Sequence, residues 1–271
     1  MPAEIIKEDY NSLASTYDQY FSNFTRPHSQ ELVKRLNINN DVTVLDLACG
    51  TGTITVQLRE YVSEKGRILA VDSSEQMLKR AKEKINEKNV EFICGDMLEI
   101  LDACQENSFD CVTCGWAIGY ASPPKLLKKI KRVIKQNGKI GIIENRKDTL
   151  APLRETGIKV MQRYPQHIRY VMDLTLRLPR DKRHLERLYK KAGLKSLEVW
   201  EGEVEFSFKD GREVLNWVLH TGASAGFDRM MDPKVKNKCD NAFIEIIERD
   251  HKTKEGINIS HKYVAGIAEK I

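Results

Sequence analysis

Short apolar runs alternate with longer amphipathic segments along the first half of the chain. The short runs are rich in Val, Ile and Leu, and the segments between them repeat apolar residues at helical i, i+3, i+4 spacing. Strands that are apolar on both faces and alternate with helices indicate a parallel sheet covered on both sides. The predicted strands are residues 43–48, 66–72, 90–96, 109–115 and 138–145. Gly138 follows a helical segment and is expected to end it in the left-handed conformation.

The pattern loosens after residue 145. Residues 181–194 form one regular amphipathic segment, residues 195–208 read as a long strand, and residues 261–270 read as a closing strand. We therefore expect an α/β fold with a Rossmann-like, seven-stranded, mostly parallel, doubly wound sheet and a helical cap over the carboxyl ends of the strands. No linker or internal repeat divides the chain, so we expect a single domain, 1–271, with helical additions at 1–38, 147–180 and 210–252.

Composition and charge narrow the class of protein only slightly. The chain is 41% hydrophobic and 31% charged, as in ordinary soluble proteins, and its 44 basic against 39 acidic side chains do not favour nucleic acid. We find no signal-peptide pattern and no apolar run of about 18 residues, so we expect a cytoplasmic protein without a membrane partner. Cys111 and Cys114 lie three apart in a predicted strand and would point to opposite faces, so we expect no metal site.

The stretch VLDLACGTGTITVQL, residues 44–58, leads from an apolar strand through small residues into a helical pattern. Glycine lets the backbone approach a ligand, and the following helix offers free N–H groups at its positive end. A nucleoside triphosphate loop requires a lysine, and none follows Gly50 before Arg59. A dinucleotide loop beginning at Gly50 has Gly52 in place but Thr55 at the third glycine position, which weakens the case for NAD without excluding it.

The segment LDLACGTGT resembles the first motif of the class I S-adenosylmethionine-dependent methyltransferases, an acid followed by small residues at alternate positions. The matching residues are Asp46, Ala48, Gly50 and Gly52. S-adenosylmethionine carries a sulfonium and an ammonium group, so a carboxylate at the strand end suits it, whereas the same carboxylate would repel a pyrophosphate. The resemblance implies S-adenosylmethionine as the cofactor and S-adenosylhomocysteine as its product.

Further segments resemble other motifs of this family. ILAVDSSEQML ends a strand at Asp72, an acid that we expect to be exposed and that would reach the ribose of either S-adenosylmethionine or NAD. VEFICGDMLEI is similar to the adenine site, FDCVTCGWAIGY to the segment beside the methionine part, and NSLASTYDQYF to a helix whose tyrosine closes over the cofactor. The resemblance thus implies cofactor contacts from Tyr17, Asp46, Ala48, Gly50, Gly52, Asp72, Ser73, Met77, Gly95, Asp96, Met97, Gly115 and Trp116.

The acceptor side is less well defined by the sequence. Glu144 ends the fifth predicted strand, and Tyr164 and His167 lie in a basic, aromatic segment of the kind that covers the acceptor in this family. Each is a candidate for contacting the acceptor, each also has an ordinary structural explanation, and no catalytic base is assigned. We expect methyl transfer to a small-molecule acceptor by in-line attack on the sulfonium methyl. An RNA methyltransferase and a non-catalytic S-adenosylmethionine-binding protein are the alternatives, and the oligomeric state stays open.

Overall fold

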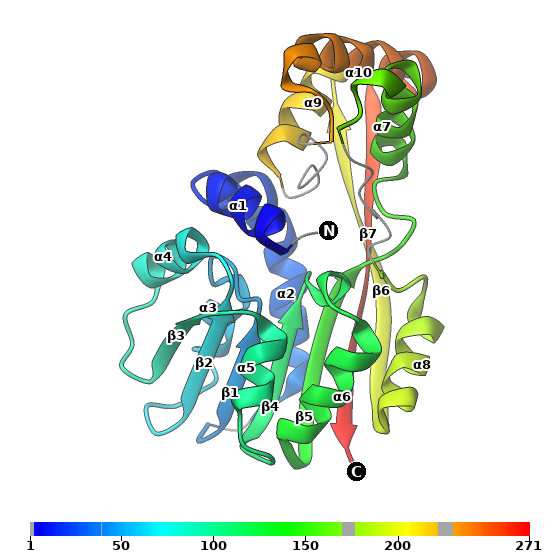
Figure 1. The fold of residues 1–271 in the computed structure, drawn as a ribbon. Coiled ribbons are helices and arrows are strands. Elements are labelled where there is room, and N and C mark those ends of the chain that lie inside the picture. Colours follow the sequence, from blue (N-terminus) through cyan, green and yellow to red (C-terminus); the bar gives the residue numbers. More distant parts are fainter. Residues whose placement is uncertain (1–2, 39, 170–176, 222–229) are drawn as a thin grey trace. The chain divides into compact units, whose positions relative to one another are not determined.

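The computed structural model describes residues 3–38, 40–169, 177–221 and 230–271. Its seven-stranded sheet has the order β3-β2-β1-β4-β5-β7-β6, which confirms the predicted fold class (Figure 1). Strands β1 to β5 are parallel where they pair, and β7 runs antiparallel to β5. The strands are β1 Thr43–Leu47, β2 Arg67–Asp72, β3 Val90–Cys94, β4 Phe109–Gly115, β5 Ile134–Asn145, β6 Leu194–Phe208 and β7 Ile257–Lys270.

The helices follow the amphipathic segments closely. They are α1 Ala3–Leu13, α2 Asn23–Leu36, α3 Thr53–Leu58, α4 Glu75–Lys84, α5 Met97–Ala103, α6 Pro123–Val133, α7 Ala151–Arg163, α8 Lys182–Ala192, α9 Gly211–His220 and α10 Lys236–His251. A π-helical turn, Asp18–Ser22, and short 3-10 turns at Ile118–Tyr120, Pro165–His167 and Pro233–Val235 complete the described elements. None of the helices in the described part of the chain has the length and apolar character that crossing a bilayer requires.

The expected role of Gly138 is wrong. Helix α6 ends at Val133 and β5 begins directly at Ile134, so Gly138 lies inside the strand. The left-handed residue is its neighbour Asn137, with φ 62°, near the point where the pairing of β5 with β4 shifts register. Asparagine tolerates this conformation better than most residues, so an irregularity within the strand replaces the expected helix end.

The described chain forms two compact units. The first unit comprises Met1–Phe21, Asp148–Leu174 and Glu203–Lys262, and the second comprises Ser22–Lys147, Thr175–Gly202 and Tyr263–Ile271. Two parts of the predicted additions, residues 170–176 and 222–229, lie outside the described residues. A single domain over 1–271 therefore stays a prediction, and each unit is described by itself below.

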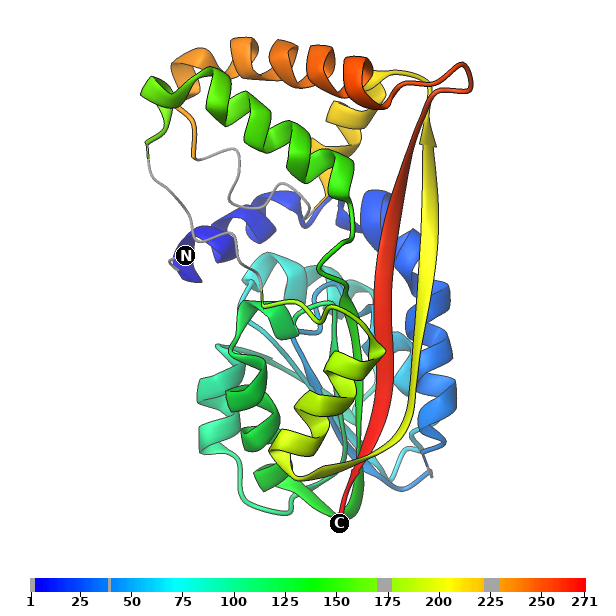
Figure 2. The same ribbon diagram turned by 90° about the vertical axis from the view of Figure 1, so that its right-hand side faces the viewer.

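The sheet of the second unit has an apolar core on each face. Helices α5, α6 and α8 pack on one face and α2 and α3 on the other (Figure 2). Cys114 belongs to the first of these cores and Cys111 to the second, and both are buried. The two thiols therefore lie on opposite faces of β4, as the strand geometry predicts. Among the described residues, no group of three or more His, Cys, Asp or Glu side chains is arranged to hold a metal ion.

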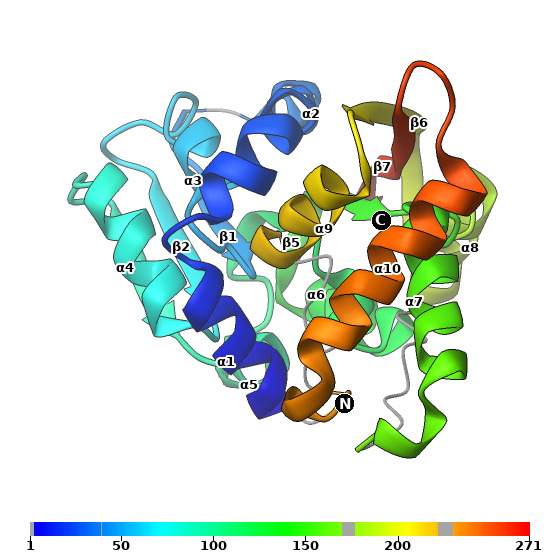
Figure 3. The same cartoon turned by 90° about the horizontal axis from the view of Figure 1, so that it is seen from above.

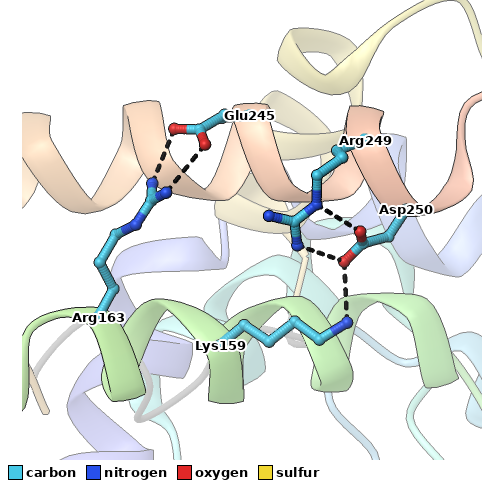
Figure 4. A network of polar contacts seen from close by, with 5 residues as sticks. All are labelled: Lys159, Arg163, Glu245, Arg249 and Asp250. Carbon is cyan, nitrogen blue, oxygen red and sulfur yellow. Dashed lines mark hydrogen bonds and ion pairs between the residues drawn. The ribbon is translucent and has the colours of Figure 1, made fainter.

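Helices α7 and α10 lie side by side in the first unit (Figure 3). The guanidinium group of Arg163 donates two hydrogen bonds to the carboxylate of Glu245, at 2.7 and 2.9 Å, in a bidentate ion pair. The ammonium group of Lys159 donates to the carboxylate of Asp250 at 2.8 Å (Figure 4). Arg249 donates to the same Asp250 carboxylate at 2.7 and 3.0 Å. Exposed ion pairs contribute little individually to stability, so the packing of Val160 of α7 with Ala242 and Ile246 of α10 in a buried apolar cluster holds these two helices together.

Candidate functional site

The loop between β1 and α3 has an unusual backbone. Ala48, Gly50 and Gly52 all have positive φ, at 52°, 57° and 86°. The amide of Cys49 donates to the carbonyl oxygen of Val71, and the amide of Gly50 donates to the carboxylate of Asp72. These two hydrogen bonds hold the loop against the end of β2. A Cβ built at Gly50 would meet no atom within 4 Å. That open space lets a ligand approach the backbone.

Ala48 occupies a conformation that favours glycine. A left-handed backbone costs a residue with a Cβ about 1–2 kcal/mol, while glycine costs about 0.4–1 kcal/mol through the entropy of the unfolded chain. We therefore expect Ala48→Gly to raise the free energy of unfolding by about 0.5 kcal/mol, measured by urea denaturation. The same substitution at Ala81, a buried residue of α4, should lower it by about 1 kcal/mol or more. A loss of stability in the Ala48 variant would contradict the assigned strain.

Asp46 lies beneath this loop and has almost no exposed surface. The hydroxyl of Thr55 donates to its Oδ2 at 2.7 Å, and the hydroxyl of Thr113 donates to its Oδ1 at 2.7 Å. Burial raises the pKa of Asp46 to about 6, against the opposing effect of the two hydroxyl groups. The carboxylate thus links β1 to α3 and β4, and a direct contact with the cofactor stays a prediction.

The carboxylate of Asp72 accepts hydrogen bonds from two loops, the one after β1 and the one after β2. One carboxylate oxygen accepts from the amide of Gly50 at 2.8 Å, and the other accepts from the amide of Ser74 at 2.8 Å. The residue is half-buried, so the expectation of an exposed acid is wrong. Burial raises the pKa of its carboxyl group, and the backbone donors oppose that shift. The backbone of Ser73 acts on the same carboxyl group, so of about four acceptor positions Asp72 keeps at least one for a further donor.

The residues predicted to contact adenine lie at the ends of β2 and β3. Asp96 is exposed and caps α5, since its Oδ1 accepts from the amides of Leu98 and Glu99 at 2.8 and 3.2 Å. Met97 is half-buried, whereas Met77, in the first turn of α4, is fully buried, and its contact with adenine stays a prediction. The remaining predicted residues here are Ser73, which is exposed, and Gly95, whose amide donates to the carbonyl oxygen of Asp72.

The loop after β4 is held by the neighbouring strand. Gly115 pairs with Ile143 across the sheet, and the amide of Trp116 donates to the carbonyl oxygen of Ile143 at 2.6 Å. Trp116 has φ 60°, and its indole N–H donates to the hydroxyl of Ser29 on α2. The Trp116 side chain therefore packs against α2, and the backbone of this loop faces the edge formed by the strand ends.

Glu144 fastens the same loop from the end of β5. One of its oxygens accepts from the amide of Gly119 at 3.1 Å, and the other accepts from the amide of Asn145 at 2.7 Å. The side chain is almost fully buried, and this burial raises its pKa to about 7. These contacts make Glu144 a support of the loop that contains Gly115 and Trp116.

Three predicted residues lie in the first unit. Tyr17 is half-buried between the rings of Tyr10 and Phe21, with ring centroids 5.9 and 5.2 Å away. Tyr164 is the residue after α7, and His167 ends a 3-10 turn whose carbonyl oxygen accepts from the amide of Asp232. The second unit brings the other predicted residues together at its strand ends, so contacts of these three with cofactor or acceptor stay predictions.

Sequence reasoning missed several supporting side chains. Thr55 was noted only as a failed third glycine, yet its hydroxyl bonds Asp46. Thr113 and Ser29 lie far away in sequence from their partners, and nothing in the local pattern marks them. The ammonium of Lys84 donates to the carbonyl oxygen of Thr51 in the loop after β1, at 2.8 Å. Its position at the end of an amphipathic helix resembles that of any solvated lysine.

Comparison with known proteins agrees with this architecture. The model of a family described as a methyltransferase domain matches residues 38–193. A demethylmenaquinone methyltransferase of Lactococcus lactis is 31% identical over 217 residues, which cover 72% of this chain and 84% of that protein. A Bacillus halodurans structure assigned as a methyltransferase superposes with a TM-score of 0.60 at 19% identity, covering 89% of this chain and 98% of the other. The structure of a Streptomyces coelicolor geranyl diphosphate C-methyltransferase bound to S-adenosyl-L-homocysteine superposes with a TM-score of 0.52 at 14% identity. The superposition covers 90% of this chain and 77% of the other.

Proposed function

Because this chain belongs to the methyltransferase family, we propose that it methylates a ring carbon of a small quinol. Family membership confirms the predicted reaction class: the protein is an S-adenosylmethionine-dependent enzyme that acts on a small molecule. The match that carries the quinol proposal spans 84% of a protein named for demethylmenaquinone. A quinol ring is electron-rich, so a ring carbon can attack an electrophilic methyl group and then lose its proton.

The residues at the strand ends of the second unit fit the cofactor. S-adenosylmethionine, when bound, supplies a methyl group made electrophilic by a positively charged sulfur. Asp72 keeps acceptor capacity for the ribose, and Asp96 is exposed and uses only its Oδ1 to cap α5, which leaves its other oxygen for the adenine amine. The open space over Gly50 gives the backbone of the loop access to the methionine part.

Glu144 is assigned a positioning role. Both of its oxygens already accept from backbone amides, those of Gly119 and Asn145, and almost no surface of the side chain is exposed. A general base must lie within hydrogen-bond reach of the proton that it removes. We therefore propose that Glu144 holds the loop containing Gly115 and Trp116 in place for the cofactor, and we assign no base to the ring proton.

Product analysis tests the proposed acceptor. The purified protein is incubated with S-adenosylmethionine and a short-chain demethylnaphthoquinone, either reduced to the quinol or left oxidised, and the products are separated and weighed by mass spectrometry. We expect one added methyl group with the quinol and none with the quinone, because only the reduced ring is electron-rich. Parallel reactions contain tRNA. Methylated tRNA together with unmodified quinol would refute the proposal.

A further inference from the structure

The positive charge of this protein is concentrated on two neighbouring helices. Helices α6 and α8 pack beside each other on the same face of the second unit (Figure 2). Together they carry ten basic side chains and one acidic side chain, a formal charge of +9, whereas the whole chain carries +5. The rest of the chain is therefore net acidic. We call the outward side of α6 and α8 the basic face.

Most cations of the basic face are not neutralised. Within the part of the chain that the structure describes, the one ion pair made by α6 or α8 joins Lys129 to Asp102. Positive charge also acts on His184 of α8: burial lowers the pKa of its imidazole, and the charges of Arg180 and Arg187 lower it further. The exposed cations of the basic face are Lys125, Lys128, Lys182, Arg183, Arg187, Lys190 and Lys191.

The two helices present charge outward and apolar groups inward. Leu126 and Ile130 of α6 and Leu185 of α8 are fully buried against the sheet, so a partner would meet ammonium and guanidinium groups and little apolar surface. Helix α6 begins at Pro123, soon after the loop that follows β4. Its first turn thus lies at the edge of the sheet where the strand ends gather the cofactor residues.

We propose that the basic face binds the anionic headgroups of a membrane. The proposal rests on the proposed function, since a quinol is largely apolar and partitions into a bilayer, so an enzyme that methylates it would reach it at the membrane surface. Clusters of four to eight Lys and Arg are typical of surfaces that bind anionic lipids. Such binding is peripheral and electrostatic, which differs both from a membrane span and from the sequence expectation of no membrane partner.

Vesicle binding by the full-length protein tests the proposal. The protein is sedimented with vesicles of phosphatidylcholine alone or mixed with phosphatidylglycerol. The test variant is Lys125→Gln, Lys128→Gln, Lys190→Gln and Lys191→Gln combined. We expect the wild-type protein to bind only the mixed vesicles, to lose binding when salt is raised because screening shortens the reach of charge, and to bind at least about tenfold more tightly than the variant.

A matched variant controls for net charge. It replaces four lysines elsewhere in the second unit, Lys65, Lys79, Lys82 and Lys88, with glutamine, and all four are exposed. The control should bind the mixed vesicles within about threefold of the wild type. Equal losses in both variants, no preference for phosphatidylglycerol, or tighter binding of tRNA than of vesicles at the same salt would overturn the proposal. No methyl transfer is measured, so a failed quinol assay leaves this result intact.

Discussion

Replacing Asp72 with alanine is expected to weaken S-adenosylmethionine binding about a hundredfold. Hydrogen bonds to a charged group contribute about 1.5–3 kcal/mol each, so loss of the contact with the ribose amounts to about 3 kcal/mol. The substitution also releases the amide of Gly50, which Asp72 holds at 2.8 Å, so the loop after β1 loses one of its fastenings. Calorimetric titration with S-adenosylmethionine measures the affinity.

Asp110 offers a matched control for this substitution. It is also a half-buried carboxylate that accepts a backbone amide, that of Thr43 at 2.8 Å, but it lies at the other end of the sheet, near the start of β4. Asp110→Ala should lose comparable stability and keep cofactor affinity within about threefold. If both variants bind alike, or if Asp72→Ala keeps its affinity, the ribose contact assigned to Asp72 is wrong.

Glu144 is expected to make the stability of the protein fall as pH rises. Its pKa is raised from 4.5 to about 7 by burial, so the folded state keeps a proton that the unfolded state releases first. The stabilisation by the neutral form is complete below about pH 4.5 and is lost as pH rises through about 7. The shift corresponds to about 3 kcal/mol in the free energy of unfolding.

Glu144→Gln isolates this effect. Glutamine does not titrate, so its altered contacts with Gly119 and Asn145 change stability by the same amount at every pH. Urea denaturation near pH 5 and pH 8 should show the difference in free energy of unfolding between wild type and variant moving by about 2.5 kcal/mol in favour of the variant. The raised pKa values of Asp46 and Asp72 affect both proteins equally. An unchanged difference between the two pH values would show that Glu144 titrates normally.

The central strands β1, β2 and β4 were predictable because each is a nearly continuous apolar run. Burial on both faces demands that pattern, and all seven strands lie where the sequence places them, with β5 and β7 each beginning four residues earlier than expected. The turn after β1 was also predictable, since Gly50 and Gly52 take the positive φ that glycine permits. The strands and the turn after β1 each depend on residues that are adjacent in the sequence, so a local pattern is enough to predict them.

The environments of the acids were not predictable. Asp46 and Asp72 were expected to face the ligand, but each also holds protein groups, and the partner of Asp46 at Thr113 is 67 residues away. Only the pairing of β1 with β4 brings that hydroxyl beside the carboxylate. Long-range contacts of this kind decide burial and pKa, whereas the motif reports only which side chain stands at the strand end.

The place of β7 in the sheet has a consequence for how the structure is assembled. This strand is the last in sequence, yet it lies between β5 and β6. Until residues 257–270 have been synthesised, β6 has no neighbour to pair with, and the edge of β5 stays open. Chains truncated before residue 257 would expose the unpaired backbone N–H and C=O groups of β5 and β6 and would be prone to aggregate.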